Sequence, residues 1–539
     1  MCLHLCAAGQ ASSSCLPEGV TISKQEHIDD FSTVYSGCTK ISGSLAISGP
    51  RITNLDGLKT LRAIGGNLKI TGNDILVSLP GMENLDSIYG DLILISNPAL
   101  TSIQSLRNVS FIGGDVQIMN NTSLADLGGI TVDTIMGSLI LQGNDSLNHL
   151  TGLDSLKCIN GNFRINVNNR LTDLSGAPRL HHLNGSLTIE NNSNLTSFGI
   201  LPLDSILGNV VVAYNSNLTD FMGLDSLHFI KGDLMVTRNS TMEDLRGLNT
   251  LQVIGGNVGI DYNNAMKNIS GLALLRTITG DFKLNGNNAL VAMRGLQSLS
   301  HISGDFILDD NRTLPYLPAL KALRTIQGNM TISANIYLME LRGLGSLTYL
   351  GGNLSISNNP QLTSLDGLDS LTILKGSLLI FNNSSLTDLR GLNQVDPEWM
   401  TGMVIENSNS LSDCEAVSLC KYLEGHQHVQ ISNNAPGCNS VAEVLSSCSI
   451  AADLTARGNI VLYPDPGSAI VYIKGLTSET ASVDLKNIHG LLIKNWGHSK
   501  KQLDFTNLPD GMYIIKIRQQ DTIMVKRVVK DKTKIVIAG

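Results

Sequence analysis

The sequence predicts a mainly β protein, in which a solenoid with one parallel strand per coil of about 24 residues precedes a small all-β sandwich. Three observations support this fold class. A glycine that opens the motif Gly-(Ser/Asn/Asp)-apolar-x-apolar recurs fifteen times from Gly43 to Gly376, at a spacing of 23 or 24 residues. Asparagine stands seven residues after this glycine, and Leu or Met ten residues after it, in fourteen of the fifteen units. Beyond Cys448 the repeat stops and short β-rich segments take its place.

Each repeat unit predicts its own local structure when the motif glycine is counted as position 0. Apolar residues at positions 2 and 4 alternate with other residues, which predicts a short strand with one face turned inward. The asparagine at position 7 follows that strand, and buried amides stacked from coil to coil can form a hydrogen-bonded ladder. The glycine would permit a tight or positive-φ turn before the strand. Only the first unit departs at position 7, where it has Pro50.

Both ends of the repeat carry clusters of cysteines. A solenoid exposes its first and last coils, so disulfides there would reinforce edges that no neighbour covers, and they imply an oxidising compartment. After Gly376 the repeat degrades into two further coils, at 401–411 and 429–434.

Zinc binding by Cys414, Cys420, His426, His428 and Cys438 is permitted by their spacing, but disulfides are the favoured interpretation. The four late cysteines allow three pairings, which the sequence leaves open. The disulfide candidates are Cys15, Cys38, Cys414, Cys420, Cys438 and Cys448.

Composition and missing motifs exclude several classes of function. The net charge of −8 and the lack of a clustered basic patch argue against nucleic-acid binding. No run of about 18 to 20 apolar residues predicts a membrane span. No nucleophile elbow, phosphate-binding loop or zinc-protease helix motif occurs, so we expect no enzyme activity, no cofactor and no metal.

The repeat resembles the leucine-rich-repeat superfamily and, within it, the receptor L domain of insulin-receptor-like and epidermal-growth-factor-receptor-like proteins. The resemblance rests on the glycine motif, the asparagine at position 7 and the leucine at position 10, and it covers residues 41–394. It is specific for the fold and says less about function. Residues 15–41 also resemble the N-terminal cap of bacterial proteins of this type, which implies a disulfide between Cys15 and Cys38.

The residues after the repeat predict an all-β sandwich of about 80 residues. Gly, Pro, Asn and Asp separate short segments that are rich in β-branched and aromatic residues. The expected strands are Ala469–Ile473, Ser482–Leu485, Gly490–Ile493, Met512–Arg518 and Ile523–Val529.

This C-terminal region resembles the sorting domain of the type IX secretion system of Bacteroidetes. It opens with a Tyr-Pro-Asp-Pro sequence where the family usually has asparagine in third place, and a hairpin motif and basic residues follow in the family order. The resemblance implies export across the outer membrane by the type IX machinery, followed by release or by attachment to surface lipopolysaccharide. The protein would then be secreted or held on the outer surface of a Gram-negative bacterium. The motif residues are Tyr463, Pro464, Asp465, Pro466, Gly511, Tyr513, Lys526 and Lys530.

The outward face of the solenoid strands is the candidate binding surface. Its central position, position 3, varies from coil to coil while the inward positions stay apolar, as expected of a recognition face. We therefore expect a non-enzymatic binding protein for a protein or glycan ligand. The alternative is a structural surface or matrix spacer without a specific ligand. The candidate binding residues are Lys69, Ile93, Gln117, Ile140, Arg164, Met235, Lys283 and Ile307.

The predicted domain organisation follows from where the repeat starts and stops. The first residues have an apolar stretch and small residues, as at the end of a secretory signal. The expected segments are a signal-peptide remnant at 1–14, a disulfide N-cap at 15–42, the solenoid at 43–410, a cysteine-containing C-cap at 411–450, a linker at 451–458 and the sorting domain at 459–539.

Overall fold

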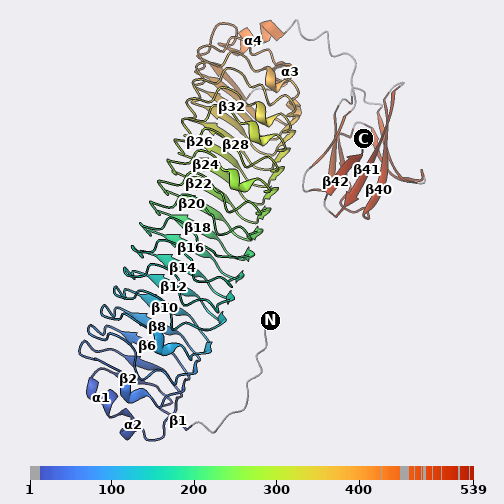
Figure 1. Cartoon of the computed structure of the whole chain (residues 1–539). Coiled ribbons are helices and arrows are strands. Elements are labelled where there is room, and N and C mark those ends of the chain that lie inside the picture. The colour runs from blue at the N-terminus through green and yellow to red at the C-terminus, as the bar shows by residue number, and fades with distance from the viewer. Residues whose placement is uncertain are drawn as a thin grey trace.

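The computed structural model describes residues 13–426, 428–448, 461–465, 468–474, 476, 481–488, 490–498, 500–519, 522–532 and 534–538. Figure 1 shows a long stack of coils with a small β module beside its last coils. The mainly β class is confirmed, as is the solenoid of about 17 coils with parallel strands about 24 residues apart. Most of the predicted signal remnant and the whole predicted linker lie outside the described residues.

One long parallel sheet runs the length of the stack, and we call it the main sheet. Each coil contributes one strand, which pairs with the strands of the coils before and after it. The two degraded coils at the end join in the same way, so their assignment as coils is confirmed. In order, the strands are β2 (Val20–Ile22), β4 (Leu45–Ile47), β6 (Leu68–Thr71), β8 (Leu92–Ile95), β10 (Val116–Met119), β12 (Leu139–Gln142), β14 (Phe163–Asn166), β16 (Leu187–Glu190), β18 (Val210–Ala213), β20 (Leu234–Thr237), β22 (Val258–Asp261), β24 (Phe282–Asn285), β26 (Phe306–Asp309), β28 (Met330–Ser333), β30 (Leu354–Ser357), β32 (Ser377–Phe381), β33 (Gly402–Glu406) and β34 (Val429–Ser432).

A second parallel sheet of two-residue strands lines another side of the stack, and we call it the flank sheet. Its strands are β1 (Ser14–Cys15), β3 (Lys40–Ile41), β5 (Ala63–Ile64), β7 (Ser87–Ile88), β9 (Phe111–Ile112), β11 (Thr134–Ile135), β13 (Cys158–Ile159), β15 (His182–Leu183), β17 (Ser205–Ile206), β19 (Phe229–Ile230), β21 (Val253–Ile254), β23 (Thr277–Ile278), β25 (His301–Ile302), β27 (Thr325–Ile326), β29 (Tyr349–Leu350) and β31 (Ile373–Leu374). Short 3₁₀ turns connect some coils: η1 (Asp56–Leu58), η2 (Gln104–Leu106), η3 (Ser270–Leu272), η4 (Pro318–Leu320), η5 (Arg342–Leu344), η6 (Arg390–Leu392) and η7 (Pro397–Trp399).

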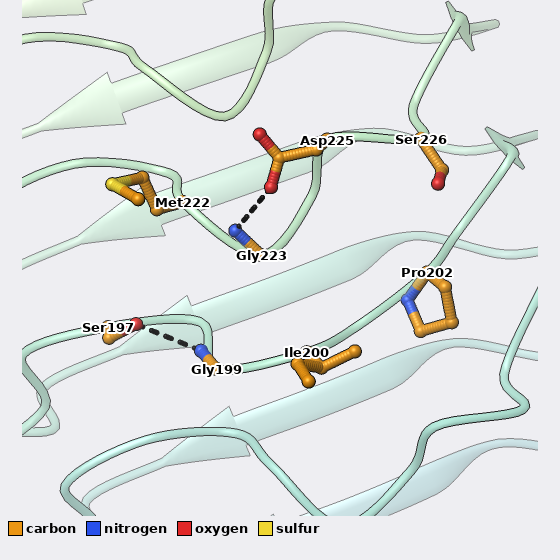
Figure 2. A pocket seen from close by; sticks show the side chains of 8 residues that line it. All are labelled: Ser197, Gly199, Ile200, Pro202, Met222, Gly223, Asp225 and Ser226. Atoms are coloured by element: carbon orange, nitrogen blue, oxygen red, sulfur yellow. Dashed lines mark hydrogen bonds between the residues drawn. The ribbon is translucent and has the colours of Figure 1, made fainter.

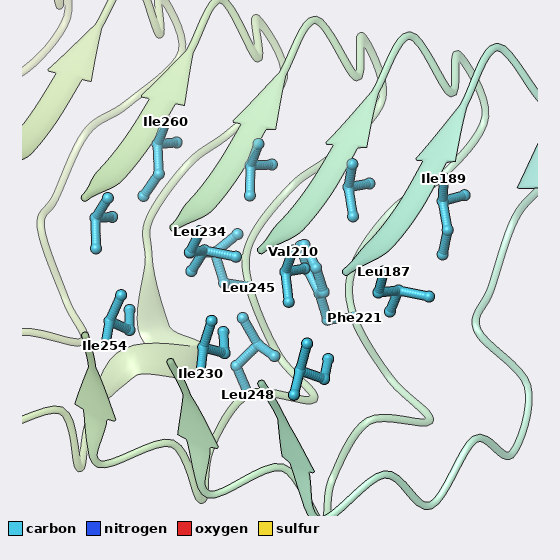
Figure 3. Packing of buried hydrophobic residues seen from close by; sticks show 14 of the residues in the cluster. Leu187, Ile189, Val210, Phe221, Ile230, Leu234, Leu245, Leu248, Ile254 and Ile260 are labelled. Carbon is cyan, nitrogen blue, oxygen red and sulfur yellow. The ribbon is translucent and has the colours of Figure 1, made fainter. Parts of the chain in front are cut away.

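The core is one continuous column of aliphatic side chains between these sheets. Residues at positions 2 and 4, such as Leu187 and Ile189, are fully buried and pack on their counterparts in the next coil (Figure 3). Phe198 and Phe221 add a stacked ring pair with centroids 5.1 Å apart. Since each coil covers the apolar side of its neighbour, burial accumulates only by stacking.

The asparagines at position 7 form the predicted ladder. Asn215 is fully buried, and both its backbone N–H and its side-chain amide donate to Oδ1 of Asn239, at 3.0 and 3.3 Å. The same side-chain amide donates to the carbonyl of Ile189 in the preceding coil, at 2.9 Å. One asparagine therefore joins three consecutive coils, and the pattern repeats from Asn73 to Asn383.

The motif glycines are required by a close approach between coils. The described glycines with positive φ lie at other positions, so the positive-φ alternative is wrong. A Cβ on Gly161 would lie 2.6 Å from the carbonyl carbon of Gly137 in the coil below. Glycine at position 0 therefore lets successive coils approach to sheet distance.

Disulfides close both ends of the stack. At the front, Cys15 pairs with Cys38 beside the short helices α1 (Gln25–Asp29) and α2 (Phe31–Val34), as the family resemblance implied. At the back, α3 (Val417–Gly425) and α4 (Val441–Cys448) cover the last coils. The three disulfides are Cys15–Cys38, Cys414–Cys438 and Cys420–Cys448, which answers the pairing that the sequence left open.

The C-terminal module consists of two small antiparallel sheets. A three-stranded sheet has the order β35 (Val461–Pro464), β36 (Ile470–Lys474) and β39 (Gln502–Asp504). A five-stranded sheet has the order β38 (Leu492–His498), β37 (Ser482–Asn487), β40 (Gly511–Gln519), β41 (Thr522–Asp531) and β42 (Lys534–Ala538). The five expected strands are present with shifted ends, while β35, β39 and β42 were missed because each is short or lies beside Pro, Gly or a terminus.

Candidate functional site

The candidate binding residues lie in one row along the outward face of the main sheet. Strand register places Lys69, Ile93, Gln117, Ile140 and Arg164 on five successive strands, each opposite the next. Farther along, Met235, Gly259, Lys283 and Ile307 are aligned in the same way. The structure therefore brings the eight residues together as two groups of one row, separated by Thr188 and Val211.

This row is less exposed than isolated anchor residues would be. Lys69 and Arg164 are exposed, but the other six residues are half-buried. The apolar members Ile93, Ile140, Met235 and Ile307 thus lie partly covered beside their neighbours. Arg164 lies 3.6 Å from the carboxylate of Glu190, so part of its charge is matched within the face. The row therefore forms a continuous surface of apolar, polar and charged side chains, in which few apolar groups protrude.

Position 1 of each coil also points outward but has a structural role. The side chain at this position accepts the backbone N–H of position 1 in a neighbouring coil. Asp91 N–H, for example, donates to Oδ1 of Asn67 at 2.9 Å, and Asp115 N–H donates to Oδ1 of Asp91 at 2.8 Å. This second ladder explains why Ser, Asn and Asp occupy position 1, since each carries a short acceptor side chain.

Position 6 distinguishes three central coils from the rest. From Gly72 to Asn382 every residue at this position has a positive φ, between +51° and +67°, and most are Gly, Asn, Asp or small residues. In three consecutive coils the position holds Tyr214, Arg238 and Tyr262 instead. Large side chains are costly in this left-handed conformation, by about 1–2 kcal/mol each. This group was not predicted from the sequence, although the residue just before the ladder asparagine is visibly larger in these three coils.

These three residues form a stack, which we call the Tyr-Arg-Tyr stack. The Arg238 guanidinium lies 5.6 Å from the Tyr214 ring centroid and 5.5 Å from that of Tyr262, and Nη1 donates to the Tyr214 hydroxyl at 3.2 Å. The tyrosines keep 47% and 43% of their surface exposed, so the stack projects from the face. Gly286 provides space beyond it, because a Cβ there would lie 2.5 Å from the Tyr262 ring.

A buried carboxylate lies beside the stack. Asp261 precedes Tyr262 in the chain and is only 8% exposed, and burial raises its pKa despite the Lys283 ammonium at 3.5 Å. Its Oδ1 forms no hydrogen bond among the described residues and has only this ion pair. Met235 covers Gly259, where a Cβ would lie 2.7 Å from the methionine methyl. Cationic, aromatic, acidic and apolar groups therefore meet within four coils.

A separate depression of about 330 Å³ opens on the connecting loops (Figure 2). Its chemistry is limited, since Asp225 carries the one titratable side chain among its eight described lining residues. That carboxylate accepts the N–H of Gly223 at 3.0 Å, and Ser197 accepts the N–H of Gly199 at 3.0 Å. Both polar groups therefore hold loop backbone, and the depression offers no acid–base pair.

In the candidate zinc set at the C-cap, the cysteines form disulfides and one histidine stacks on an aromatic ring. Disulfides engage Cys414, Cys420 and Cys438, which leaves no thiolate there for zinc. His426 stacks on Tyr422 with ring centroids 4.1 Å apart. Within the described residues, no group of three or more His, Cys, Asp or Glu side chains is arranged to hold a metal ion.

Asp465 of the first sorting motif makes local hydrogen bonds at the end of β35. Asp465 accepts a hydrogen bond from the Ser468 hydroxyl at 2.9 Å, and its backbone N–H donates to the carbonyl of Ile470 at 2.8 Å. At the position where the family usually has asparagine, the aspartate side chain thus accepts a local hydrogen bond, as Asn and Asp both can. Tyr463 and Pro464 belong to β35, while Pro466 lies outside the described residues.

The second half of the sorting motif is largely structural. The Tyr513 side chain is buried, and its hydroxyl donates to the carbonyl of Pro509 at 2.6 Å, beside Gly511. Lys530 is only 6% exposed and donates to Asp510 at 2.8 Å, which holds the pKa of that carboxyl below its usual range. Lys526 remains half-buried. The turn motif and Lys530 therefore stabilise one hairpin together.

Comparison with known families agrees with both parts of the fold. Residues 37–128 match the receptor L domain family, and residues 461–531 match the secretion system C-terminal sorting domain. None of the curated proteins compared with the chain matches it. In the described part of the chain, none of the helices has the length and apolarity of a membrane span.

The sorting domain indicates export, with secretion or a cell-surface location, and it implies interaction with the type IX secretion machinery and a source in Bacteroidetes. The chain therefore joins a leucine-rich-repeat-like solenoid, whose first coils match the receptor L domain family, to a secretion system C-terminal sorting domain.

Proposed function

We propose that this exported protein is a non-enzymatic binding protein, whose main sheet recognises a protein or glycan with the Tyr-Arg-Tyr stack at the centre of the contact. The observation that carries the proposal is the presence of Tyr214, Arg238 and Tyr262 at a left-handed position that favours Gly or Asn. Folding alone does not favour Tyr or Arg at position 6, because Asn adopts the same left-handed conformation there in several other coils.

The surroundings of the stack suit recognition. Tyrosine and arginine are the residue types that dominate binding energy at interfaces, because they combine large apolar area with fixed polar groups. The half-buried row at position 3 runs beside them and would extend the contact across neighbouring coils. A relationship to receptor L domains at the front of the stack also supports a binding role.

The absence of enzyme activity remains part of this proposal. It is supported by the lack of catalytic motifs in the sequence and by the single carboxylate of the loop depression. Asp261 is buried and forms an ion pair with Lys283 of the next strand, which gives its carboxylate a structural partner.

A triple substitution tests the binding surface. Tyr214→Asn, Arg238→Asn and Tyr262→Asn place the residue that Asn191 and Asn358 already provide at the same coil position. We expect saturable binding of labelled protein to cell-surface protein extracts or a glycan array to fall by about 100-fold or more, as for loss of several contact residues. Val167→Asn is the matched control, because Val167 is 38% exposed at the same position of another coil. Unchanged binding by the triple variant would contradict the assignment.

A structural spacer is the second candidate function. Two side-chain ladders and a continuous core make a stiff rod, which a surface matrix could use without any specific ligand. If neither the unaltered protein nor Val167→Asn shows saturable binding, this alternative is favoured. Attachment to lipopolysaccharide fits either function, and surface fractionation of cells with and without residues 459–539 tests it.

A further inference from the structure

The flank sheet changes character in its last strands. The first residue of each two-residue strand points outward, and from β3 to β25 that residue is exposed or half-buried. In β27, β29 and β31 the equivalent residues are buried, with Thr325, Tyr349 and Ile373 exposed by only 5%, 8% and 2%. The last three strands of the flank sheet are therefore covered by another part of the chain.

The C-terminal module supplies this cover. Tyr472 of β36 is 5% exposed and forms an apolar cluster with Tyr349 and Ile373 of the flank sheet. Around that cluster pack Trp399 from η7, Tyr463 from β35 and Ile470 from β36. The rings of Trp399 and Tyr472 meet edge to face, with centroids 4.5 Å apart. The three-stranded sheet of the module thus faces the solenoid.

One lysine is enclosed at the centre of this contact. The Lys375 ammonium lies 5.3, 5.9 and 5.0 Å from the rings of Tyr349, Trp399 and Tyr472, and it donates to the Tyr472 hydroxyl at 2.9 Å. Asp465 of the first sorting motif lies 3.8 Å away. Burial alone would lower the pKa of Lys375, but its interactions with Tyr472, Tyr349 and Asp465 outweigh burial and raise it. The lysine therefore stays charged between the two parts of the chain.

Two further polar contacts surround the cluster. Lys474 of β36 donates to the carbonyl of Gln394 at 3.0 Å, and Lys501 pairs with Glu398 of η7. Both acceptors belong to the irregular coil that follows Gly376. In that coil Ser377 pairs with Gly402, 25 residues later, whereas the strands from β4 to β32 pair at 23 or 24. The same coil contains η7, which provides Glu398 and Trp399 to the contact.

We propose that these last coils are a docking platform for the chain's own sorting module, which holds its three-stranded sheet against the solenoid and leaves its five-stranded sheet to face the secretion machinery. The irregular coil is then a functional departure from the repeat. Leu492 of β38, Met512 of β40 and Val525 of β41 remain 57%, 46% and 53% exposed, as a surface free for a partner requires. The proposal does not depend on whether the main sheet binds a ligand.

Cutting the full-length chain between the two parts tests the platform. A specific protease site is placed within 451–458, and the cut protein is passed through size-exclusion chromatography. We expect the module to elute with the solenoid. Elution of an intact module apart from the solenoid, at concentrations where the uncut protein is folded, would overturn the proposal.

Substitutions on each side of the contact make the test specific. Lys375→Gln and Tyr472→Phe remove the enclosed charge and its hydrogen bond while keeping the apolar surfaces, and each should weaken retention of the cut module by about tenfold. Trp399→Ala should weaken it further. Lys231→Gln is the matched control, since Lys231 precedes its motif glycine as Lys375 does but is exposed. Circular dichroism confirms that each variant is folded, and equal retention by the control and the three variants would contradict the assignment.

Discussion

Two neighbouring positions in every coil show opposite behaviour. Position 7 is a fully buried asparagine that joins three coils, while position 6, one residue earlier, is exposed or half-buried in most coils and varies from glycine to tyrosine. The left-handed backbone at position 6 directs the side chain of position 7 into the stack, so the backbone conformation is restricted at both positions. A fixed backbone conformation therefore does not require a fixed side chain. Position 6 has only the first, and position 7 has both.

The largest expected effect comes from breaking the ladder in mid-stack. Asn239→Ala removes the acceptor for the backbone and side-chain N–H groups of Asn215 and the donor to the carbonyl of Val212. Leaving these buried groups unpaired should lower the free energy of unfolding by about 4 kcal/mol. Urea denaturation followed by circular dichroism measures the loss. Ser240→Ala is the adjacent exposed control, with a change below about 0.5 kcal/mol expected. A loss for Asn239→Ala as small as that of the control would show that the ladder is dispensable.

A smaller, pH-dependent effect is expected from the buried carboxylate beside the stack. The pKa of Asp261 is raised in the folded protein above the ordinary value of 3.8, so the folded state holds the proton more tightly than the unfolded state. Its stabilising contribution is present below about pH 3.8 and is lost as the pH rises through the raised pKa. Asp261→Asn should therefore increase the free energy of unfolding by about 1 kcal/mol at pH 7 and leave it nearly unchanged at pH 3.

Denaturation of both proteins across that pH range measures this difference. Asn285 occupies the same position in the next coil and is buried, so asparagine fits there without rearrangement. An equal stability difference at pH 3 and pH 7 would rule out titration of Asp261 as the cause.

The smallest effect is expected at position 6 itself. Arg238→Asn loses the contacts with the two tyrosine rings but relieves the left-handed strain of a long side chain, and the two changes nearly offset each other. The free energy of unfolding should shift by less than about 1 kcal/mol, in either direction. Thermal and urea denaturation check this value. A loss comparable to that of Asn239→Ala would mean that the Tyr-Arg-Tyr stack is part of the fold, and would weaken its assignment to binding.

The repeated features of the fold were predictable because they recur at fixed spacing. The asparagine at position 7 and the apolar residues at positions 2 and 4 appear in coil after coil, so their buried roles follow from period and residue type. The strand register then placed Lys69 to Arg164 in the row expected of them. The role of the motif glycine was only partly predicted, since the close approach of Gly161 to Gly137 depends on how coils stack.

Features that occur once were not predictable in the same way. Nothing in the local sequence of Lys375 distinguishes it from Lys231, which stands at the same coil position, because its enclosure depends on Tyr472, 97 residues later. The sequence identified Lys530 only as a basic residue of the sorting motif, and the structure shows that it is a buried partner of Asp510. The Tyr-Arg-Tyr stack was visible in the sequence, but its meaning required the backbone conformation of position 6.

The disulfides at the two ends have a consequence for how long the protein lasts outside the cell. In an array held together only by contacts between neighbours, we expect the terminal coils to be lost first, because each of them has a single neighbour. The Cys15–Cys38 bond and the two bonds of the C-cap hold those terminal coils covalently. In an oxidising environment these bonds make the loss of a terminal coil harder, so we expect reducing agents to shorten the working lifetime of the protein.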